Sequence, residues 1–262
     1  MSRDFTLAKY AHLCETIEKL DCPVMTIRQF LEAGQPQKFV VVLRHDVDRQ
    51  LARAIAMAEL EAAYGFPSTY YFRTTQAVFR PTALKHLHKL GHEVGYHYEV
   101  LTKTWGNTEK AGSLFDRELK KFRQIVPVHT ASMHGSPLMP WNNLDFWQAY
   151  CIQAYDLLGE AYLSIDYSNM YYFTDTGRSW NAGRYNLRDH TGSRQPQKIV
   201  QTTDDLMHFL TKSPNSPVFI NTHPNRWTSN WSGWMLSMVS DWLINQVKWA
   251  VSMSRNQSTR RQ

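Results

Sequence analysis

FVVVLRHDVDR, residues 39–49, is the stretch of sequence that decides the fold. It begins with the apolar run Phe39–Leu43, which is rich in Val and is followed at once by charged residues. A short, Val-rich run bounded by polar residues is typical of a strand that is buried on both faces of a parallel sheet. The stretch therefore predicts a central strand of an α/β protein.

Charged side chains gather at the carboxyl end of this predicted strand. Because side chains alternate along a strand, we expect Arg44, Asp46 and Asp48 to share one face. His45 and Val47 then lie on the other face. Two carboxylates and an arginine are costly to keep at a strand end unless they are used, and active sites of parallel α/β proteins lie there. We interpret these charges as functional, the alternative being a frayed strand end with a local ion pair.

Helical and extended patterns alternate along the chain. The predicted helices span residues 5–20, 26–31, 51–65, 81–90, 108–125, 144–150, 203–210 and 234–253. Further strands are predicted at 68–73, 92–100, 129–137 and 217–224, with short extended pieces at 161–168 and 170–177. Such alternation is typical of parallel βαβ units. A barrel is favoured over an open doubly wound sheet, because polar clusters follow at least four strands and a barrel brings strand ends around one mouth.

The sequence indicates one domain. No repeat, low-complexity linker or change of composition divides the chain. We therefore predict a single barrel domain over residues 1–254, with a helical N-terminal flank at 1–36 and a closing helix at 234–254. Residues 255–262 are polar and basic and are predicted to form a disordered tail.

Composition narrows the class of protein. Hydrophobic residues make up 43% and charged residues 20% of the 262 residues, which is ordinary for a globular protein. The net charge of +6 suits an anionic substrate, a membrane surface or nucleic acid. We expect no nucleic-acid partner, because the basic residues are scattered and no recognisable binding module is present.

Cysteine usage and the N-terminal segment point to a reducing cytoplasm. Cys14, Cys22 and Cys151 form no CxxC pair, and their odd number argues against a disulfide framework. Residues 1–15 lack the continuous apolar segment of a signal peptide. No stretch approaches the roughly 18 apolar residues of a membrane span. We therefore expect a cytoplasmic protein.

Polar clusters follow several of the predicted strands. Besides residues 44–48, they comprise His97 with Glu99, His134 with Ser136, and Thr222 with His223, while Asp166, Asp175 and Arg178 come from the irregular middle of the chain. Asp, His and Glu without Cys, brought together from separate strands, match a divalent ion such as zinc. The same residue types also suit a metal-free acid–base site.

Five strings occur in order between residues 38 and 228: LRHDVD, GHEVGYHYE, MHGSP, YFTDTGRSW and NTHPNRW. Their order and spacing resemble the polysaccharide deacetylases of carbohydrate esterase family four, and most closely a bacterial branch that carries HDVD and YHYE. The resemblance covers most of the chain. It implies a distorted (β/α) barrel of about seven strands that holds one divalent metal, usually zinc, and hydrolyses an N- or O-acetyl group on a sugar.

The resemblance implies a set of metal ligands. Asp48 and His97 correspond to two of them. The family's second metal histidine would fall on Leu101, which cannot bind metal. The third ligand is therefore open between His134 and Glu99, and we favour His134.

The resemblance also implies acid–base roles. Asp46 corresponds to the base, His223 to the catalytic histidine, and Asp166 resembles the aspartate that orients this histidine. Arg44 is expected to keep Asp46 ionised and in place. Substrate-binding roles are predicted for Arg44, Glu99, Asp175, Arg178 and Trp227. The alternative for Asp175 and Arg178 is a turn with an ion pair.

These features together predict a metal-dependent deacetylase. In the cytoplasm it would act on a nucleotide- or lipid-linked acetylated sugar during bacterial surface-glycan synthesis, and the positive charge suits a diphosphate-bearing substrate. One alternative is a hydrolase of another non-peptide C–N bond, such as a cyclic amide or a ureide. The other is a catalytically inactive glycan-binding relative, which the departure at Leu101 permits.

The closing helix is rich in Trp. We expect Trp234, Met238, Trp242 and Trp249 to pack this helix on the barrel. The alternative is an interfacial helix that makes peripheral contact with a membrane and brings the enzyme to lipid-linked glycans.

Overall fold

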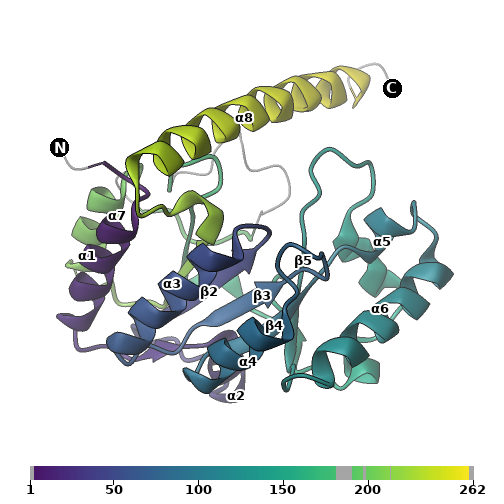
Figure 1. Ribbon diagram of the computed structural model, residues 1–262, viewed down its shortest axis with the longest axis horizontal. Helices are drawn as coiled ribbons and strands as arrows, with labels where there is room; N and C mark the ends of the chain where they lie inside the picture. The colour runs from purple at the N-terminus through teal and green to yellow at the C-terminus, as the bar shows by residue number, and fades with distance from the viewer. Residues whose placement is uncertain (1–2, 181–190, 197–198, 213, 260–262) are drawn as a thin grey trace.

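A curled parallel sheet forms the centre of the protein in the computed structural model (Figure 1). The structure describes residues 3–180, 191–196, 199–212 and 214–259, with the backbone alone at 244 and 247–259. The strands are β1 (Val24–Met25), β2 (Val41–Val47), β3 (Thr69–Phe72), β4 (Glu93–Tyr98), β5 (Thr130–Met133), β6 (Gly159–Glu160), β7 (Tyr171–Thr174) and β8 (Val218–Thr222). All their pairings are parallel.

The strand order is that of a barrel. In space the order is β6-β5-β4-β3-β2-β8-β7, and β1 pairs with the first residues of β2. Around the barrel, the strands from β2 to β8 follow one another in chain order. The barrel is open between its two edge strands, β6 and β7. The predicted α/β class and distorted barrel of about seven strands are confirmed.

Helices connect the strands and cover the sheet. They are α1 (Leu7–Glu18), α2 (Ile27–Glu32), α3 (Leu51–Ala63), α4 (Pro81–Lys89), α5 (Val100–Lys103), α6 (Thr108–Arg123), α7 (Thr203–Leu210) and α8 (Trp231–Thr259), with short 3₁₀ helices η1 (Asn143–Gln148), η2 (Ile152–Tyr155), η3 (Tyr167–Asn169) and η5 (Pro224–Arg226). Capping residues in the sequence explain where several of these helices begin. Thr26 and Thr202 each form a capping box, and Asn107 accepts a hydrogen bond from the backbone of Lys110.

The two faces of β2 pack in different parts of the core. Val40 and Val42 belong to a buried cluster inside the barrel, together with Tyr71 and Phe219. Val41 and Leu43 belong to another cluster, which includes residues of α1, α3 and α7. The alternation expected for β2 is therefore observed, and every residue of the strand is buried.

Three segments differ from the prediction. The strand β1 is a two-residue element that was not predicted. Residues 161–168 do not form an extended piece, because the Glu160 carboxylate accepts the backbone N–H groups of Tyr162 and Leu163 and turns the chain. Helix α8 continues to Thr259, into the segment expected to be a disordered tail.

Helix α8 runs along one side of the molecule, above the strands in Figure 1. Trp234 and Met238 are half-buried, and Trp234 Nε1 donates to the Asp4 carbonyl at 2.8 Å. Trp242 is 59% exposed, so the prediction that it packs on the barrel is wrong. The side chain of Trp249 lies outside the described residues. Among the described residues, no helix has both the length and the apolar character needed to cross a membrane.

Gly95 in β4 allows the ring of Tyr71 to lie across that strand. A Cβ atom at position 95 would lie 2.3 Å from two ring carbons of Tyr71. The ring cannot easily move away, because it is buried and Tyr71 Oη is hydrogen-bonded to Thr130 Oγ1 at 2.8 Å. A strand glycine of this kind marks a close approach inside the barrel.

We predict that Gly95→Ala lowers the free energy of unfolding by about 1–3 kcal/mol, because the added methyl overpacks the barrel interior. Urea denaturation of the wild type and the variant measures the change. The cause is tested by Tyr71→Val, which removes the opposing ring. The double variant should lose less stability than the sum of the two single variants, and simple additivity would contradict the steric explanation.

Candidate metal centre and acid–base site

Asp48, His97 and His134 come together at the carboxyl ends of three strands. Asp48 follows β2, His97 lies in β4, and His134 follows β5. One ligand atom from each residue lies within 4.8 Å of the others. His97 Nε2 is 3.5 Å and His134 Nδ1 is 3.1 Å from Asp48 Oδ1. The three residues predicted as metal ligands are therefore brought to one place.

The chemistry of this set fits a divalent ion. Asp48 Oδ1 is buried, and although the two imidazole nitrogens lie near it, neither forms a hydrogen bond of good geometry with it, as expected for a group of metal ligands. His97 Nδ1 lies 3.0 Å from the Ser132 carbonyl, so that Nδ1–H donates and Nε2 is left as the ligand atom. Two His and one Asp match zinc sites that keep a position open for substrate or water.

Glu99, the other candidate for the third ligand, is engaged elsewhere. Arg73 donates to both of its oxygens, at 3.2 and 2.7 Å, and Lys103 Nζ lies 3.4 Å away. Leu101 is buried in α5. The geometry therefore favours His134, as predicted. Burial would raise the pKa of Asp48, but His134 and His97 together hold it well below its usual range.

Asp46 lies beside these residues and is held by Arg44. Arg44 Nε and Nη2 each donate to Asp46 at 2.9 Å, and Nη2 also donates to Ser132 Oγ at 2.6 Å. Burial alone would raise the pKa of Asp46, but Arg44, with help from His97 and His223, outweighs burial and the net shift is downward. Asp46 is therefore an ionised, fixed carboxylate. Arg44 is fully buried, so it acts on Asp46 rather than on a substrate, contrary to the predicted substrate contact.

His223, after β8, lies on the other side of Asp46. Its Nδ1 is 2.7 Å from Asp175 Oδ1, and its backbone N–H donates to Asp175 Oδ2 at 3.0 Å. Its Nε2 is 3.9 Å from Asp46 Oδ2. The imidazole is thus held at Nδ1 by a carboxylate and presents Nε2 toward Asp46.

Asp175, not Asp166, is the partner of His223. Asp166 is exposed and caps η3 by accepting the backbone N–H of Ser168. Asp175 comes directly after β7, which pairs with β8 with Thr174 opposite Asn221. This register places Asp175 beside His223, which corrects both the orienting role predicted for Asp166 and the substrate-binding role predicted for Asp175.

The Asp175 carboxylate is the most heavily bonded group of the site. It is fully buried and also accepts hydrogen bonds from Arg226 Nη1 at 2.6 Å and Trp227 Nε1 at 2.9 Å. Burial opposes ionisation, but Arg226 and His223 lower the pKa of Asp175 to about 2. Trp227 is 1% exposed, so it supports Asp175 from the core instead of contacting a substrate.

Two further residues of the site were not singled out in the sequence. Asn221 Nδ2 donates to Asp46 Oδ2 at 3.3 Å, and Arg226 holds Asp175. Both belong to the string NTHPNRW, which also carries His223. Arg178, predicted to contact substrate, donates to Ser237 Oγ at 3.0 Å and to Asp241 Oδ2 at 3.2 Å on α8.

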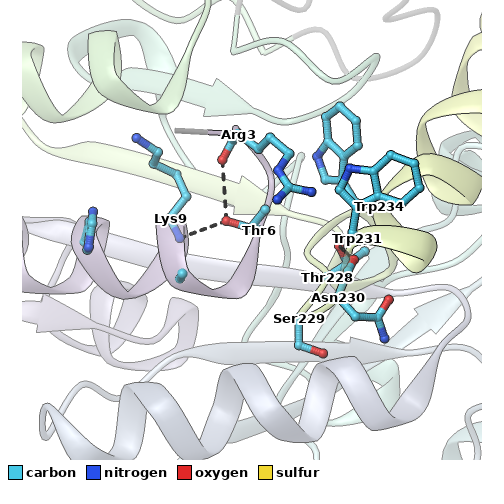
Figure 2. Close-up of a pocket in the computed structure, with 10 residues that line it drawn as sticks. Arg3, Thr6, Lys9, Thr228, Ser229, Asn230, Trp231 and Trp234 are labelled. Atoms are coloured by element: carbon cyan, nitrogen blue, oxygen red, sulfur yellow. Dashed lines mark hydrogen bonds between the residues drawn. The ribbon is translucent and has the colours of Figure 1, made fainter. Parts of the chain in front are cut away.

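A cavity of about 450 Å³ lies between the start of α1 and the start of α8 (Figure 2). Figure 2 shows Arg3 and Thr6 on the α1 side and Trp231 and Trp234 on the α8 side. None of the residues that line it belongs to the metal or acid–base set. The cavity is therefore separate from the candidate site.

Comparison with known proteins gives little further information. No protein-family model matches the sequence, and no curated protein matches it significantly. Among solved structures, PdaA of Bacillus subtilis, described as a family 4 carbohydrate esterase, is similar over 80% of this chain and 86% of that chain. The identity is 11% and the TM-score is 0.37. An identity and a TM-score this low do not assign a function, so the function has to be argued from the geometry of the site.

We predict that the purified protein holds one divalent ion per chain and that Asp48→Ala, His97→Ala and His134→Ala each abolish this binding, because three ligands are needed for a stable site. Elemental mass spectrometry of the folded variants measures metal content. Glu99→Gln is the matched control and should retain the ion. Loss of metal in Glu99→Gln with retention in His134→Ala would reverse the assignment of the third ligand.

We also predict a specific dependence of stability on pH. The pKa of Asp175 is about 2, against an ordinary value of 3.8, so its ionised form stabilises the folded state above pH ~4. This contribution is lost as pH falls toward 2. The advantage of the wild type over Asp175→Asn in free energy of unfolding should therefore shrink by about 2 kcal/mol between pH ~5 and ~2.

Chemical denaturation at several pH values measures this difference. Asp145→Asn makes the same change at an exposed carboxylate and supplies the control, and an equal loss there would point to a general effect of charge. A difference for Asp175→Asn that does not change with pH would show that Asp175 is not held ionised by its neighbours.

Proposed function

We propose that this protein is a metal-dependent hydrolase that removes an acetyl group from an N- or O-acetylated sugar. One observation carries the proposal. Asp46 Oδ2 lies 3.9 Å from His97 Nε2, in the ligand set, and 3.9 Å from His223 Nε2, on the opposite side. An ionised carboxylate thus stands between a metal-ligand cluster and a carboxylate-held histidine, which is the arrangement that acid–base hydrolysis requires.

The side of the site near Asp48, His97 and His134 would hold the metal. A divalent ion held there would supply the polarisation of an acyl carbonyl and would lower the pKa of a water molecule toward ~7. Asp46 then accepts the proton of the attacking water. Its position suits this role, because the two hydrogen bonds from Arg44 fix the carboxylate and keep it ionised.

The side of the site near His223 would serve the leaving group. Nδ1 of His223 is held by Asp175, so a proton carried on Nε2 points toward Asp46 and the reacting centre. His223 donates this proton to the departing amine or alkoxide. Asp175 stabilises the charged imidazole that is needed for this step, as the carboxylate of a catalytic triad does.

The substrate class follows from the sequence resemblance and from charge. The five strings resemble those of sugar deacetylases, and the net charge of +6 suits an anionic substrate. We propose zinc as the metal, because two His and one Asp suit it. We further propose a nucleotide- or lipid-linked acetylated sugar of bacterial surface-glycan synthesis as the substrate, and the cytoplasm as the place of reaction.

We predict that Asp46→Asn is less stable, by up to about 3–5 kcal/mol because buried Arg44 loses its charged partner, but still folds and keeps the metal. Its acetate release should fall by about 10²–10⁴-fold, since the amide cannot accept the proton of water. Release is measured on a panel of N- and O-acetylated sugars, with cyclic amides and ureides included to detect a different C–N specificity. Asp166→Asn makes the same chemical change at an exposed position and should keep full activity. Turnover by Asp46→Asn at the wild-type rate would remove Asp46 from the role of base.

A further inference from the structure

A second cavity lies beside the candidate site, between the start of α3 and α8. Its volume is about 250 Å³. Polar side chains dominate its lining: Arg49, Arg53, Asn225, Ser237, Ser240 and Asp241. Pockets for whole drug-sized ligands have volumes of about 300–1,000 Å³, so this cavity suits one small group rather than an entire cofactor.

Two arginines at this cavity have no carboxylate partner. Among the described residues, neither Arg49 nor Arg53 forms an ion pair. Arg53 Nη1 donates to the backbone carbonyl of Asn225, which orients the guanidinium against η5. Burial and the nearby charge of Arg178 lower the pKa of Arg53, and the charge of Asp241 offsets this lowering only in part.

The acidic group in the lining, Asp241, is in direct contact with other arginines. Asp241 Oδ2 accepts a hydrogen bond from Arg178 at 3.2 Å and lies 3.9 Å from Arg226 Nε. Its charge is therefore used by two other arginines. Asn225 is 6% exposed, and its Oδ1 makes no hydrogen bond. A buried amide oxygen without a partner indicates that a donor, such as a hydroxyl group, belongs next to it.

The start of α3 adds to the attraction for an anion. The helix has 13 residues, its first turn contains no acidic residue, and its N-cap, Gln50, makes no side-chain capping bond. The free N–H groups and the dipole of such a terminus favour negative charge. The two arginines, the buried amide and the start of α3 thus lie around the same cavity.

This cavity is connected to the catalytic cluster through neighbouring residues. Arg49 directly follows Asp48, and Asn225 is two residues beyond His223. Arg226 contacts Asp175 on one side and Asp241 on the other. None of the lining residues belongs to the metal or acid–base set, so the cavity is a neighbouring site that these residues join to that set.

We propose that this cavity binds a phosphate group of the substrate, with Arg49 and Arg53 as its cationic partners. Planar guanidinium groups bind phosphate oxygens through paired, charge-assisted hydrogen bonds. The identity of the attached sugar rests on the proposed function, whereas the affinity for phosphate does not.

Pyrophosphate binding to the metal-loaded protein, measured by titration calorimetry, tests the anion site. Arg49→Gln and Arg53→Gln should each weaken binding by about tenfold, because each removes a charge-assisted contact. Arg53→Lys, which keeps the charge, should recover part of the loss. Arg80→Gln is the matched control, since Arg80 is exposed at the start of α4. Any pyrophosphate bound at the metal itself is common to all these proteins and cancels in the comparison.

Two results would overturn the proposal. One is wild-type affinity in the Arg49→Gln, Arg53→Gln double variant. The other is an equal loss in Arg80→Gln, which would indicate attraction by net charge alone. Arg49 is exposed, so Arg49→Gln keeps the test decisive if changes at Arg53 impair folding.

Acetate release then separates this proposal from the proposed function and identifies the source of the phosphate. Uridine diphosphate N-acetylglucosamine and a lipid-linked diphosphate sugar in vesicles are compared with free N-acetylglucosamine. The phosphorylated substrate that fits should have a lower KM than the free sugar, and the double variant should lose this difference while its kcat changes little. Acetate release from none of them, with pyrophosphate binding intact, would contradict the deacetylase function and leave the anion site standing.

Discussion

The buried ion pair between Arg44 and Asp46 is the interaction on which the site depends. Both residues lie on β2 inside the barrel, and Arg44 is fully buried. Arg44 also reaches Ser132 on β5, and its guanidinium carbon lies 4.6 Å from the centroid of the Tyr162 ring. Removing one member of such a pair leaves an uncompensated buried charge, at a cost of about 3–5 kcal/mol. The contacts of Arg44 therefore join opposite parts of the barrel and also hold in place the Asp46 carboxylate, the proposed base.

The opposite face of β2 carries a second buried polar network, which supports the site from behind. His45 lies 2.6 Å from Thr222 Oγ1 and 2.7 Å from Glu61 of α3. Glu61 also accepts hydrogen bonds from Ser68 and Tyr70, at 2.6 and 2.8 Å. Burial opposes ionisation, but His45 and the other partners lower the pKa of Glu61 to about 2. Thr222 directly precedes His223. This network therefore fixes β8 relative to β2, and with it the distance between Asp46 and His223.

Helix α8 supports the site through a chain of ion pairs. Asp241 on α8 connects Arg178 and Arg226, and Arg226 in turn holds Asp175. Other positions of the helix carry exposed apolar residues, namely Leu236, Val239, Trp242 and Leu243. Trp-rich composition alone suggested packing of Trp242 on the barrel, because composition does not say which side of a helix faces the core. The polar residues Asp241 and Ser237 make the inward contacts instead.

Local chemistry in the sequence determined the central strand and most helices and strands of the barrel, and it singled out Asp46, Asp48, His97, His134 and His223 as polar groups at strand ends. These assignments were possible because side-chain alternation along a strand is local, and because polar groups directly after apolar runs mark the strand ends. Only the tertiary structure decided which carboxylate serves His223. Asp166 and Asp175 are both acidic residues of the irregular middle, and the pairing of β7 with β8 brings Asp175 alone to the imidazole. The pairing of Arg49 and Arg53 was equally hidden. Neither forms an ion pair with a described residue, and only the folded surroundings decide which charges meet.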